Sequence, residues 1–381
     1  MGLLTIGAFA RASRLSPKAL RLYDELGLLR PVRVDPVSGY RFYHPDQLEV
    51  ARLVAWLRRL GMPLARIRVV CELPPADAAR EVAAYWRQVE VDIESRRNLA
   101  AFLTDQLSRK DSSGKDTEMT EEPTGLAIRY AVRTDRGLVR ESNQDFAYAG
   151  SRLLAVADGF GPYGAPPASA VAIEALKPLE SGVPAGDLLN ALQDAVHNAD
   201  VAIRELGASD PALAGVGTTL TAMLWSGSQL ALVHVGDSRV YLLRDGELFQ
   251  ITHDHSVVQS LVDEGRLTPE EAMSHPQRAI LLRALHAGRG AEPDLRLHEA
   301  RPGDRYLLCS DGLHTVLDTA TLHEVLAGGD DPDTTVGRLV QAAVAAGGPD
   351  NIACVVADVV RPGTDRDAGG GHSAAARRQP V

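Results

Sequence analysis

The sequence lacks the features of a membrane or secreted protein. None of its apolar runs reaches about 18 residues, so no membrane-spanning helix is predicted. The first residues, MGLLTIGAFARAS, lack the basic start, long apolar stretch and cleavage site of a signal peptide. Only three cysteines occur, and Cys71, Cys309 and Cys354 are too far apart for a paired zinc motif. We therefore expect a protein of the reduced cytoplasm that has no membrane partner.

Charge is unevenly distributed along the 381 residues. The net charge is −10, but residues 1–75 carry twelve Lys and Arg against six Asp and Glu, which gives +6 there and −16 for the remainder. A basic segment joined to an acidic body indicates a polyanion-binding module fused to a second unit. An ordinary solvated helical surface would explain the same charges equally well, so charge alone does not decide between the two.

A polar segment divides the chain. Residues 109–125, RKDSSGKDTEMTEEPTG, show no apolar periodicity and end in Pro-Thr-Gly, which is typical of a linker. The chain before this segment is predicted to be helical, and the chain after it, 126–360, mixes helices and strands. Residues 361–381 are predicted to be a disordered tail. The fold class expected from this pattern is an α/β multidomain protein.

Residues 1–74 have the pattern of a winged helix-turn-helix. Thr5 is placed to cap a short helix, IGAFARA, and Ser16 and Pro17 suit the start of a second helix that Gly27 ends. Two short helices joined by a tight turn fit a helix-turn-helix. Two short strands around DPVSG then present arginines and aromatic residues as a wing, and further helices are expected at 46–60 and 64–72.

Residues 3–72 resemble the MerR family of transcription regulators. The segments that carry the resemblance are TIGAFARASRLSPKALRLYDELGLLRP, GYRFYHPDQL and LRRLGMPLARI, in that order. The resemblance implies a head that binds an inverted repeat in promoter DNA as a homodimer. It places Lys18 and Arg21 on the recognition helix and Arg41 on the wing, where such side chains neutralise phosphates and read guanine edges. Metal sensing by the head is not expected, because only Cys71 lies near the helix that follows.

Residues 75–108 are predicted to form one long helix with an apolar seam. The seam recurs at steps of three and four residues, which is typical of heptads, with Arg96 interrupting it. Its members are Val82, Trp86, Val89, Ile93, Ala100, Leu103 and Leu107. The seam could pack on its own domain, or it could pair with a second copy. The MerR resemblance favours the second, a dimerisation helix.

Five aspartates lie at the ends of predicted strands. They are Asp145, Asp158, Asp237, Asp311 and Asp350. The apolar strand LLAVA, for example, runs directly into Asp158 and Gly159. One such aspartate is usually a turn former or a helix cap. Five carboxylates at one edge of a sheet would instead make an oxygen-rich site for Mg²⁺ or Mn²⁺.

The body, residues 126–360, resembles the metal-dependent serine/threonine protein phosphatases of type 2C. The segments that carry the resemblance are DRGLVRESNQD, VADGFG, GVGTTLTAML, VGDSRVYLLRDGEL, GDRYLLCSDGL and GGPDNIACVV, in family order. The resemblance implies a β-sandwich with helices on both faces (αββα). It also implies hydrolysis of phosphoserine and phosphothreonine in a phosphoprotein substrate by a two-metal mechanism with Mn²⁺ or Mg²⁺. No Cys-x5-Arg loop is present, so no phospho-enzyme is needed.

The same resemblance assigns roles to the candidate residues. Asp158 bridges both ions, and Arg140 grips the phosphate oxygens with its planar guanidinium, which a lysine cannot do. The further ligands implied are the carbonyl of Gly159, then Asp311 and Asp350 at the first ion, then Asp237 with Asp311 at a third, weaker site, and Asp145 behind the ligands or bound through water.

The body also departs from the family pattern. Bacterial members usually read Asp-Gly-Met-Gly-Gly-His after the strand, whereas residues 158–163 read DGFGPY and lack the histidine. Gln144 stands where some relatives carry glutamate. The HDH at 253–255 looks like a metal pair, but its place in the family's flap segment favours a structural or substrate-side role.

Two alternatives to the leading interpretation stay open. The body could be a sensor that has lost catalysis, or the head could serve dimerisation without site-specific DNA binding. The retained aspartates argue against the first alternative. The basic head and its wing argue against the second.

Overall fold

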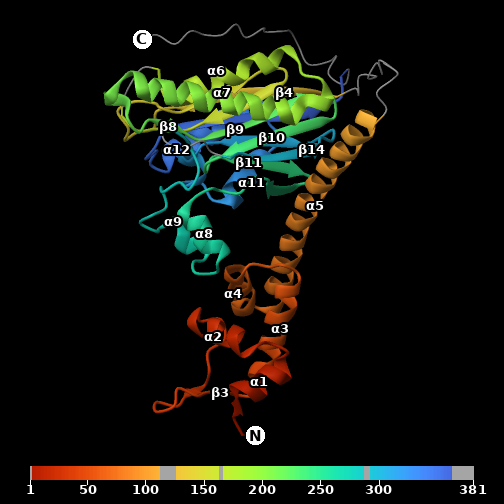
Figure 1. Cartoon of the computed structure of the whole chain (residues 1–381), viewed down its shortest axis with the longest axis vertical. Coiled ribbons are helices and arrows are strands. Elements are labelled where there is room, and N and C mark those ends of the chain that lie inside the picture. The colour runs from red at the N-terminus through yellow and green to blue at the C-terminus, as the bar shows by residue number, and fades with distance from the viewer. Residues whose placement is uncertain (1, 112–125, 163–165, 287–291, 363–381) are drawn as a thin grey trace.

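The computed structural model describes residues 2–111, 126–162, 166–286 and 292–362. A small helical head lies at one end, a long helix leads away from it, and a larger body of sheets and helices lies beside that helix (Figure 1). The predicted tail from 363 onward and residues 112–125 of the predicted linker lie outside the described residues. Within the described residues, no helix combines the length and apolar character needed to cross a membrane.

The head is a winged helix-turn-helix, as predicted. Thr5 and Ser16 cap the first two helices by accepting the N–H groups of Ala8 at 3.3 Å and Ala19 at 3.0 Å, and Gly27 follows the second helix at φ +71°. Its elements are β1 (Leu4–Thr5), α1 (Ile6–Ser13), α2 (Pro17–Glu25), β2 (Arg33–Val34), β3 (Arg41–Tyr43), α3 (Gln47–Arg59) and α4 (Leu64–Glu72).

The predicted long helix is α5 (Pro75–Asp111). It continues three residues into the segment expected to be a linker, 109–125, so the expected boundary at 108 was too early. The polar residues 109–111 are compatible with a helix end, and composition alone did not separate a helix end from a linker.

The body is a β-sandwich of two five-stranded antiparallel sheets. The first has the order β14-β10-β9-β6-β5 and the second the order β12-β11-β15-β16-β4. The strands of the first are β5 (Phe146–Ala149), β6 (Leu153–Ala157), β9 (Leu220–Ser226), β10 (Gln229–Val235) and β14 (Asp294–Glu299). The strands of the second are β4 (Ala127–Asp135), β11 (Arg239–Arg244), β12 (Glu247–Gln250), β15 (Arg305–Cys309) and β16 (Ile352–Val360).

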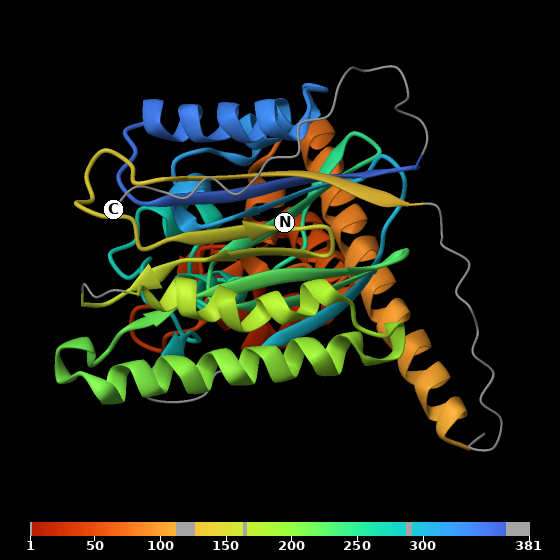
Figure 2. The same ribbon diagram turned by 90° about the horizontal axis from the view of Figure 1, so that it is seen from above.

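Helices cover the outer faces of both sheets, so the predicted αββα layering is confirmed (Figure 2). The first sheet carries α6 (Ala168–Leu176) and α7 (Leu188–Ser209), and the second carries α10 (Asp311–His314), α11 (Thr319–Ala327) and α12 (Pro332–Ala345). The shorter elements are β7 (Gly159–Phe160), β8 (Gly217–Thr218), β13 (Leu285–His286), α8 (Val257–Asp263), α9 (Pro269–Met273) and three 3-10 turns, η1 (Lys177–Ser181), η2 (Ala185–Asp187) and η3 (Pro211–Leu213).

One face of α5 closes the open edge of the sandwich. Val91 belongs to the apolar cluster between the two sheets and is 9% exposed, and Ser95 beside it is also buried. Asp92 pairs with Arg296 on the edge strand β14 at 3.2 Å, and Gln88 donates to the carbonyl of Gln250 at 2.9 Å. The helix is therefore part of the body's core as well as the connection to the head.

Truncating Val91 should destabilise the body. Val91→Ala removes two buried methyl groups at about 0.8 kcal/mol each and leaves a small cavity, so the free energy of unfolding should fall by about 2 kcal/mol. Val37→Ala, the same change at a side chain that is 95% exposed on the wing, is the matched control and should change it by less than about 0.5 kcal/mol. Equal effects of the two changes in urea denaturation of the full chain would contradict the edge-closing role of α5.

Candidate metal centre

The candidate aspartates all lie where strands end, as predicted. Asp145 precedes β5, Asp158 stands between β6 and β7, and Asp237 follows β10. Asp311 begins α10 two residues after β15, and Asp350 lies two residues before β16. Because the two sheets pack face to face, these ends meet at one end of the sandwich. The charge of Asp158 interacts with those of Asp145, Asp237 and Asp311, and the charge of Asp311 interacts with that of Asp350.

Backbone contacts hold Asp158 in place. Its N–H donates to Thr219 Oγ1 at 3.0 Å. Its carbonyl accepts from Thr218 Oγ1 and from the N–H of Thr219, both at 2.9 Å. With its main chain fixed on both sides, the position of the Asp158 carboxylate is set by the end of β6 and by the segment that joins β8 to β9.

Glycine is required at two of these strand ends. A Cβ atom on Gly159 would lie 2.5 Å from the carbonyl oxygen of Gln144, and one on Gly312 would lie 1.9 Å from that of Asn351. Both distances are far below a normal contact, so a side chain at either position would push the segments apart. Glycine beside Asp158 and Asp311 therefore allows separate segments of the chain to close around the carboxylates.

Asn351, to which the sequence pattern assigned no role, links neighbouring segments of the site by hydrogen bonds. Its Nδ2 donates to the carbonyls of Arg136 and Ser142 at 2.9 and 2.8 Å, and its Oδ1 accepts the N–H of Gln144 at 2.8 Å. These bonds fix the loop that carries Arg140 against the start of β16. Asn351 is buried, and its position directly after Asp350 was the only signal in the sequence.

Ser310 and His314 flank Asp311 and were also missed. The Oγ of Ser310 accepts the N–H of Ala353 at 2.9 Å, and its side chain also contacts Asp145. His314 lies one turn further along α10, and its Nε2 is 3.0 Å from the carbonyl oxygen of Asp237. Burial lowers the pKa of His314 to about 3, so the ring is neutral and donates from Nε2 to that carbonyl.

The negative charge of these carboxylates is only weakly offset by positive groups and hydrogen bonds. Burial and the charges of its neighbours raise the pKa of Asp158 well above its usual range, and burial is the largest cause of the raised pKa values of Asp145, Asp237 and Asp311 as well. The Oδ2 atom of Asp145 is buried without a hydrogen-bond partner. Among the residues that the structure describes, Arg140 alone forms an ion pair with these carboxylates, and its NH2 donates to Asp350 Oδ2 at 2.7 Å.

This donor set fits a hard divalent cation. All the side-chain donors are carboxylate oxygens, and such oxygens are the preferred ligands of Mg²⁺ and Mn²⁺. In the described part of the chain, no three His, Cys, Asp or Glu side chains converge as they stand on one ion position. Mg²⁺ usually keeps several waters and takes only one or two carboxylates, so the arrangement still suits this ion.

The HDH at 253–255, for which a structural or substrate-side role is expected, forms hydrogen bonds within the chain. Arg239 holds the Asp254 carboxylate with hydrogen bonds of 2.7–3.0 Å. The ring of His253 lies 2.9 Å from Asp263, and His255 Nδ1 accepts the N–H of Gly236 at 3.2 Å. These partners leave no pair of histidines directed at one ion.

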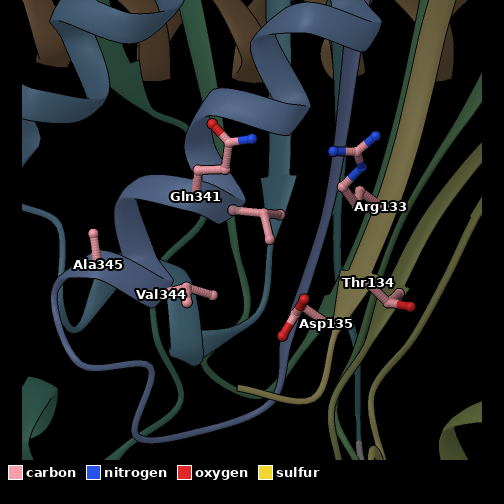
Figure 3. A pocket seen from close by; sticks show the side chains of 7 residues that line it. Arg133, Thr134, Asp135, Gln341, Val344 and Ala345 are labelled. Carbon is pink, nitrogen blue, oxygen red and sulfur yellow. The ribbon is translucent and has the colours of Figure 1, made fainter. Parts of the chain in front are cut away.

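A groove of about 570 Å³ lies away from the aspartates, between β4 and α12 (Figure 3). Side chains of the two elements face each other across it. Its lining residues are Arg133, Thr134, Asp135, Val340, Gln341, Val344 and Ala345. None of the five candidate aspartates is among them, so the groove is separate from the candidate metal centre.

The three candidate DNA-binding residues of the head differ in exposure and in their partners. Lys18 and Arg21 are exposed on α2. Arg41 lies on β3 of the wing, but its Nε donates to Asp24 on α2 at 2.7 Å. In this structure Arg41 therefore ties the wing to α2, a contact that local sequence did not indicate.

The fold and the site together define a class of proteins. Its members are helix-flanked β-sandwiches that gather aspartates for divalent metal ions at one end of the strands. Residues 139–330 match the family model for protein phosphatase 2C, and residues 4–73 match that for the MerR HTH family of regulatory proteins. The chain belongs to the protein phosphatase 2C family and carries a MerR-type head.

Several curated relatives and solved structures are similar to the body. The serine/threonine protein phosphatase PstP of Mycobacterium tuberculosis is 54% identical over 236 residues, which cover 62% of this chain and 46% of PstP. The serine/threonine phosphatase stp of Listeria monocytogenes is 34% identical over 245 residues, 61% of this chain and 97% of that protein. The chain thus spans less than half the length of the mycobacterial relative.

Two solved structures extend the likeness to three dimensions. The crystal structure of M. tuberculosis PstP/Ppp has a TM-score of 0.59 and 53% identity, covering 61% of this chain and 98% of that one. The catalytic domain of PstP in complex with two manganese ions has a TM-score of 0.58 and 51% identity, covering 62% and 99%. Both likenesses are confined to the body.

Asp158→Asn should affect stability in opposite directions with and without metal. Removing one of several crowded carboxylates should raise the melting temperature of the metal-free protein, because the raised pKa values mark repulsion in the folded state. It should also remove most of the stabilisation by Mn²⁺, which amounts to about 2.7 kcal/mol at a hundred times the dissociation constant. Asp245→Asn, at an exposed turn, is the control and should alter neither. Full Mn²⁺ stabilisation of Asp158→Asn in calorimetry would argue against a ligand at this position.

Proposed function

We propose that this protein is a metal-dependent phosphatase of phosphoserine and phosphothreonine residues in proteins, joined to a head that binds DNA as a homodimer. The observation that carries the phosphatase proposal is the cluster of five strand-end aspartates in a body of the protein phosphatase 2C family. The buried oxygen of Asp145 and the raised pKa values of its neighbours support a cation as the missing partner.

The proposed ligands are those that the family resemblance implies. Asp158, the carbonyl of Gly159, Asp311 and Asp350 would hold the two main ions, with Asp158 serving both. Asp237 with Asp311 would hold a third, weaker ion, and Asp145 would lie behind these ligands. When bound, Mn²⁺ or Mg²⁺ supplies Lewis acidity that activates a water nucleophile and neutralises charge on the phosphoryl group. The chain's own contribution is to hold the carboxylates on fixed strand ends, so that little reorganisation accompanies the reaction.

Arg140 is proposed to bind the phosphate. One nitrogen of its guanidinium contacts Asp350, and its side chain is otherwise 58% exposed at the opening of the cluster. A guanidinium has five N–H donors, so the remaining donors are available for two phosphate oxygens. Asn351 keeps this loop in register by bonding to the carbonyls of Arg136 and Ser142, which places Arg140 beside the cluster before a substrate arrives.

A phosphothreonine peptide tests the enzymatic proposal. Hydrolysis should require Mn²⁺ or Mg²⁺ and stop with EDTA, and Asp158→Ala should lower kcat at least about 100-fold, because the carboxylate serves both ions. Arg140→Ala should mainly raise KM, while calorimetric Mn²⁺ binding persists. Metal binding without any turnover by the parent protein would contradict the proposal and would support the alternative of a metal-binding sensor domain.

The proposal for the head rests on its fold and its exposed basic residues. The exposed Lys18 and Arg21 lie on α2, the second helix of the helix-turn-helix, which is the helix that enters the major groove in such motifs. Arg33 lies over the ring of Phe42 on the wing, 4.4 Å from its centroid. The head thus offers a basic helix beside a wing, which suits a phosphate backbone.

The homodimer proposal rests on the two faces of α5. While one face closes the sandwich, Val82 of the expected seam packs against the core of the head, and four further members of the seam are exposed. Trp86 and Ile93 are each 40% exposed, Leu103 is 50% and Leu107 is 66%. A second copy of α5 is the partner whose spacing matches this seam, because both helices would present the same heptads.

A dimer should be needed for tight binding to an inverted repeat. Ile93→Asp puts a charge in the seam and should convert a dimer to a monomer in sedimentation and weaken operator binding, while leaving phosphatase activity unchanged. Arg21→Ala should weaken DNA binding without changing the mass of the dimer, and affinity should fall steeply with salt. A parent chain that is monomeric at micromolar concentration, or DNA binding that is indifferent to salt, would count against this proposal.

A further inference from the structure

Residues 255–283, here called the flap, lie between the body and the head. The flap carries α8 and α9, and Figure 1 shows both helices on the side of the body that faces α4. We propose that α4 of the head is a docking surface that positions the flap beside the aspartate cluster, with Arg68 as the positioning residue. This inference rests on the proposed phosphatase function and concerns the binding of protein substrates.

The base of the flap is bonded to the cluster. The N–H of His255 donates to the carbonyl of Gly236 at 2.7 Å, and Gly236 is the residue directly before Asp237. The returning segment closes the flap, since the N–H of Leu282 donates to the carbonyl of His255 at 2.7 Å. Arg278 of the flap lies near enough to Asp311 for their charges to interact. The orientation of the flap therefore sets which side chains border the cluster.

The outer part of the flap touches the head at two points. The NH2 group of Arg68 on α4 donates to Glu271 Oε2 at 2.9 Å. A Cβ atom on Gly265 would lie 2.5 Å from the Cβ of Leu64, so the flap backbone rests directly on the first turn of α4. Gly265 also has φ +74°, a conformation that suits glycine and permits this close approach.

Glu271 is preorganised for the contact with Arg68. It forms a capping box at the start of α9, in which its Oε2 accepts the N–H of Thr268 at 2.7 Å and its own N–H donates to Thr268 Oγ1 at 3.1 Å. The carboxylate is therefore already oriented before Arg68 approaches. An ion pair with one partner held in place loses less side-chain entropy than an ordinary surface pair.

The flap has no core of its own to hold it. Neither α8 nor α9 contains a buried residue. The head, by contrast, is fixed to the body, because Arg66 of α4 pairs with Glu81 of α5 and α5 inserts Val91 between the sheets. The contact with α4 is thus a main constraint on the flap, and the head acts on the cluster through it.

The test compares a small and a large substrate. With Mn²⁺, Arg68→Glu should raise KM for a phosphothreonine peptide about three-fold, the size expected for a partly exposed ion pair, because a loosened flap borders the peptide less well. The kcat and KM for p-nitrophenyl phosphate, which has no peptide chain to contact the flap, should stay unchanged. Amide hydrogen exchange of residues 257–273 should become faster. Arg11→Glu, the same charge change on α1 at the far end of the head (Figure 1), is the matched control and should alter none of these.

A double-mutant cycle separates the contact from general loosening of the head. Glu271→Gln keeps the capping box, in which glutamine is tolerated, but removes the charge. Combined with Glu271→Gln, Arg68→Glu should have a smaller effect on peptide KM and flap exchange than it has alone, because two facing carboxylates no longer repel. Effects that simply add would overturn a direct contact.

Failure of the inference is distinguishable from failure of the proposed function. If the parent protein does not hydrolyse p-nitrophenyl phosphate with Mn²⁺, the phosphatase proposal fails, while flap exchange in Arg68→Glu still decides the docking. If the parent hydrolyses both substrates and Arg68→Glu changes neither peptide KM nor flap exchange, the docking proposal is wrong.

Discussion

Repulsion among carboxylates that share one end of the sandwich is the constraint on which the rest of the body depends. Desolvated like charges oppose folding, so the chain must hold Asp158 and its neighbours together by other means. It does so with hydrogen bonds to the Asp158 carbonyl from the Thr218 hydroxyl and the Thr219 N–H, and with glycines that let segments close at distances no side chain would permit. The architecture gathers negative charge and leaves its neutralisation to cations, which is the electrostatic basis of the proposed chemistry.

The helix α5 joins this body to the head through two different faces. Its inner face belongs to the core between the sheets through Val91, and Glu94 pairs with Arg244, which in turn pairs with Asp304 at 2.7 Å in the buried edge of the body. Its outer face carries the exposed members of the heptad seam. A second copy bound there would therefore be attached to a helix that is connected to the core of the body, and the flap contact with α4 adds a second connection. Any coupling between the state of the head and the phosphatase would be reciprocal.

Local chemistry in the sequence was enough to predict many of these elements. Thr5 and Ser16 cap helices because their side chains can accept N–H groups three residues on. The strand-end aspartates were predictable because each lies beside an apolar run, two of them in the pair Asp-Gly. Contacts between distant segments were not predictable in this way. Periodicity found the seam on α5 but gave no sign that Val91, on another face, enters the body. Nothing near Arg41 indicated its pairing with Asp24. The hydrogen bonds of the Asn351 side chain reach a loop that lies more than 200 residues away in the sequence.

Anomalous diffraction from crystals grown with Mn²⁺ is the most direct test of the central claim that the aspartate cluster is a two-metal centre. The account predicts two strong manganese peaks about 3.5–4 Å apart, with the Asp158 carboxylate between them and the Gly159 carbonyl beside one of them. The result that would contradict it is manganese bound elsewhere in the molecule, with no peak within coordination distance of Asp158.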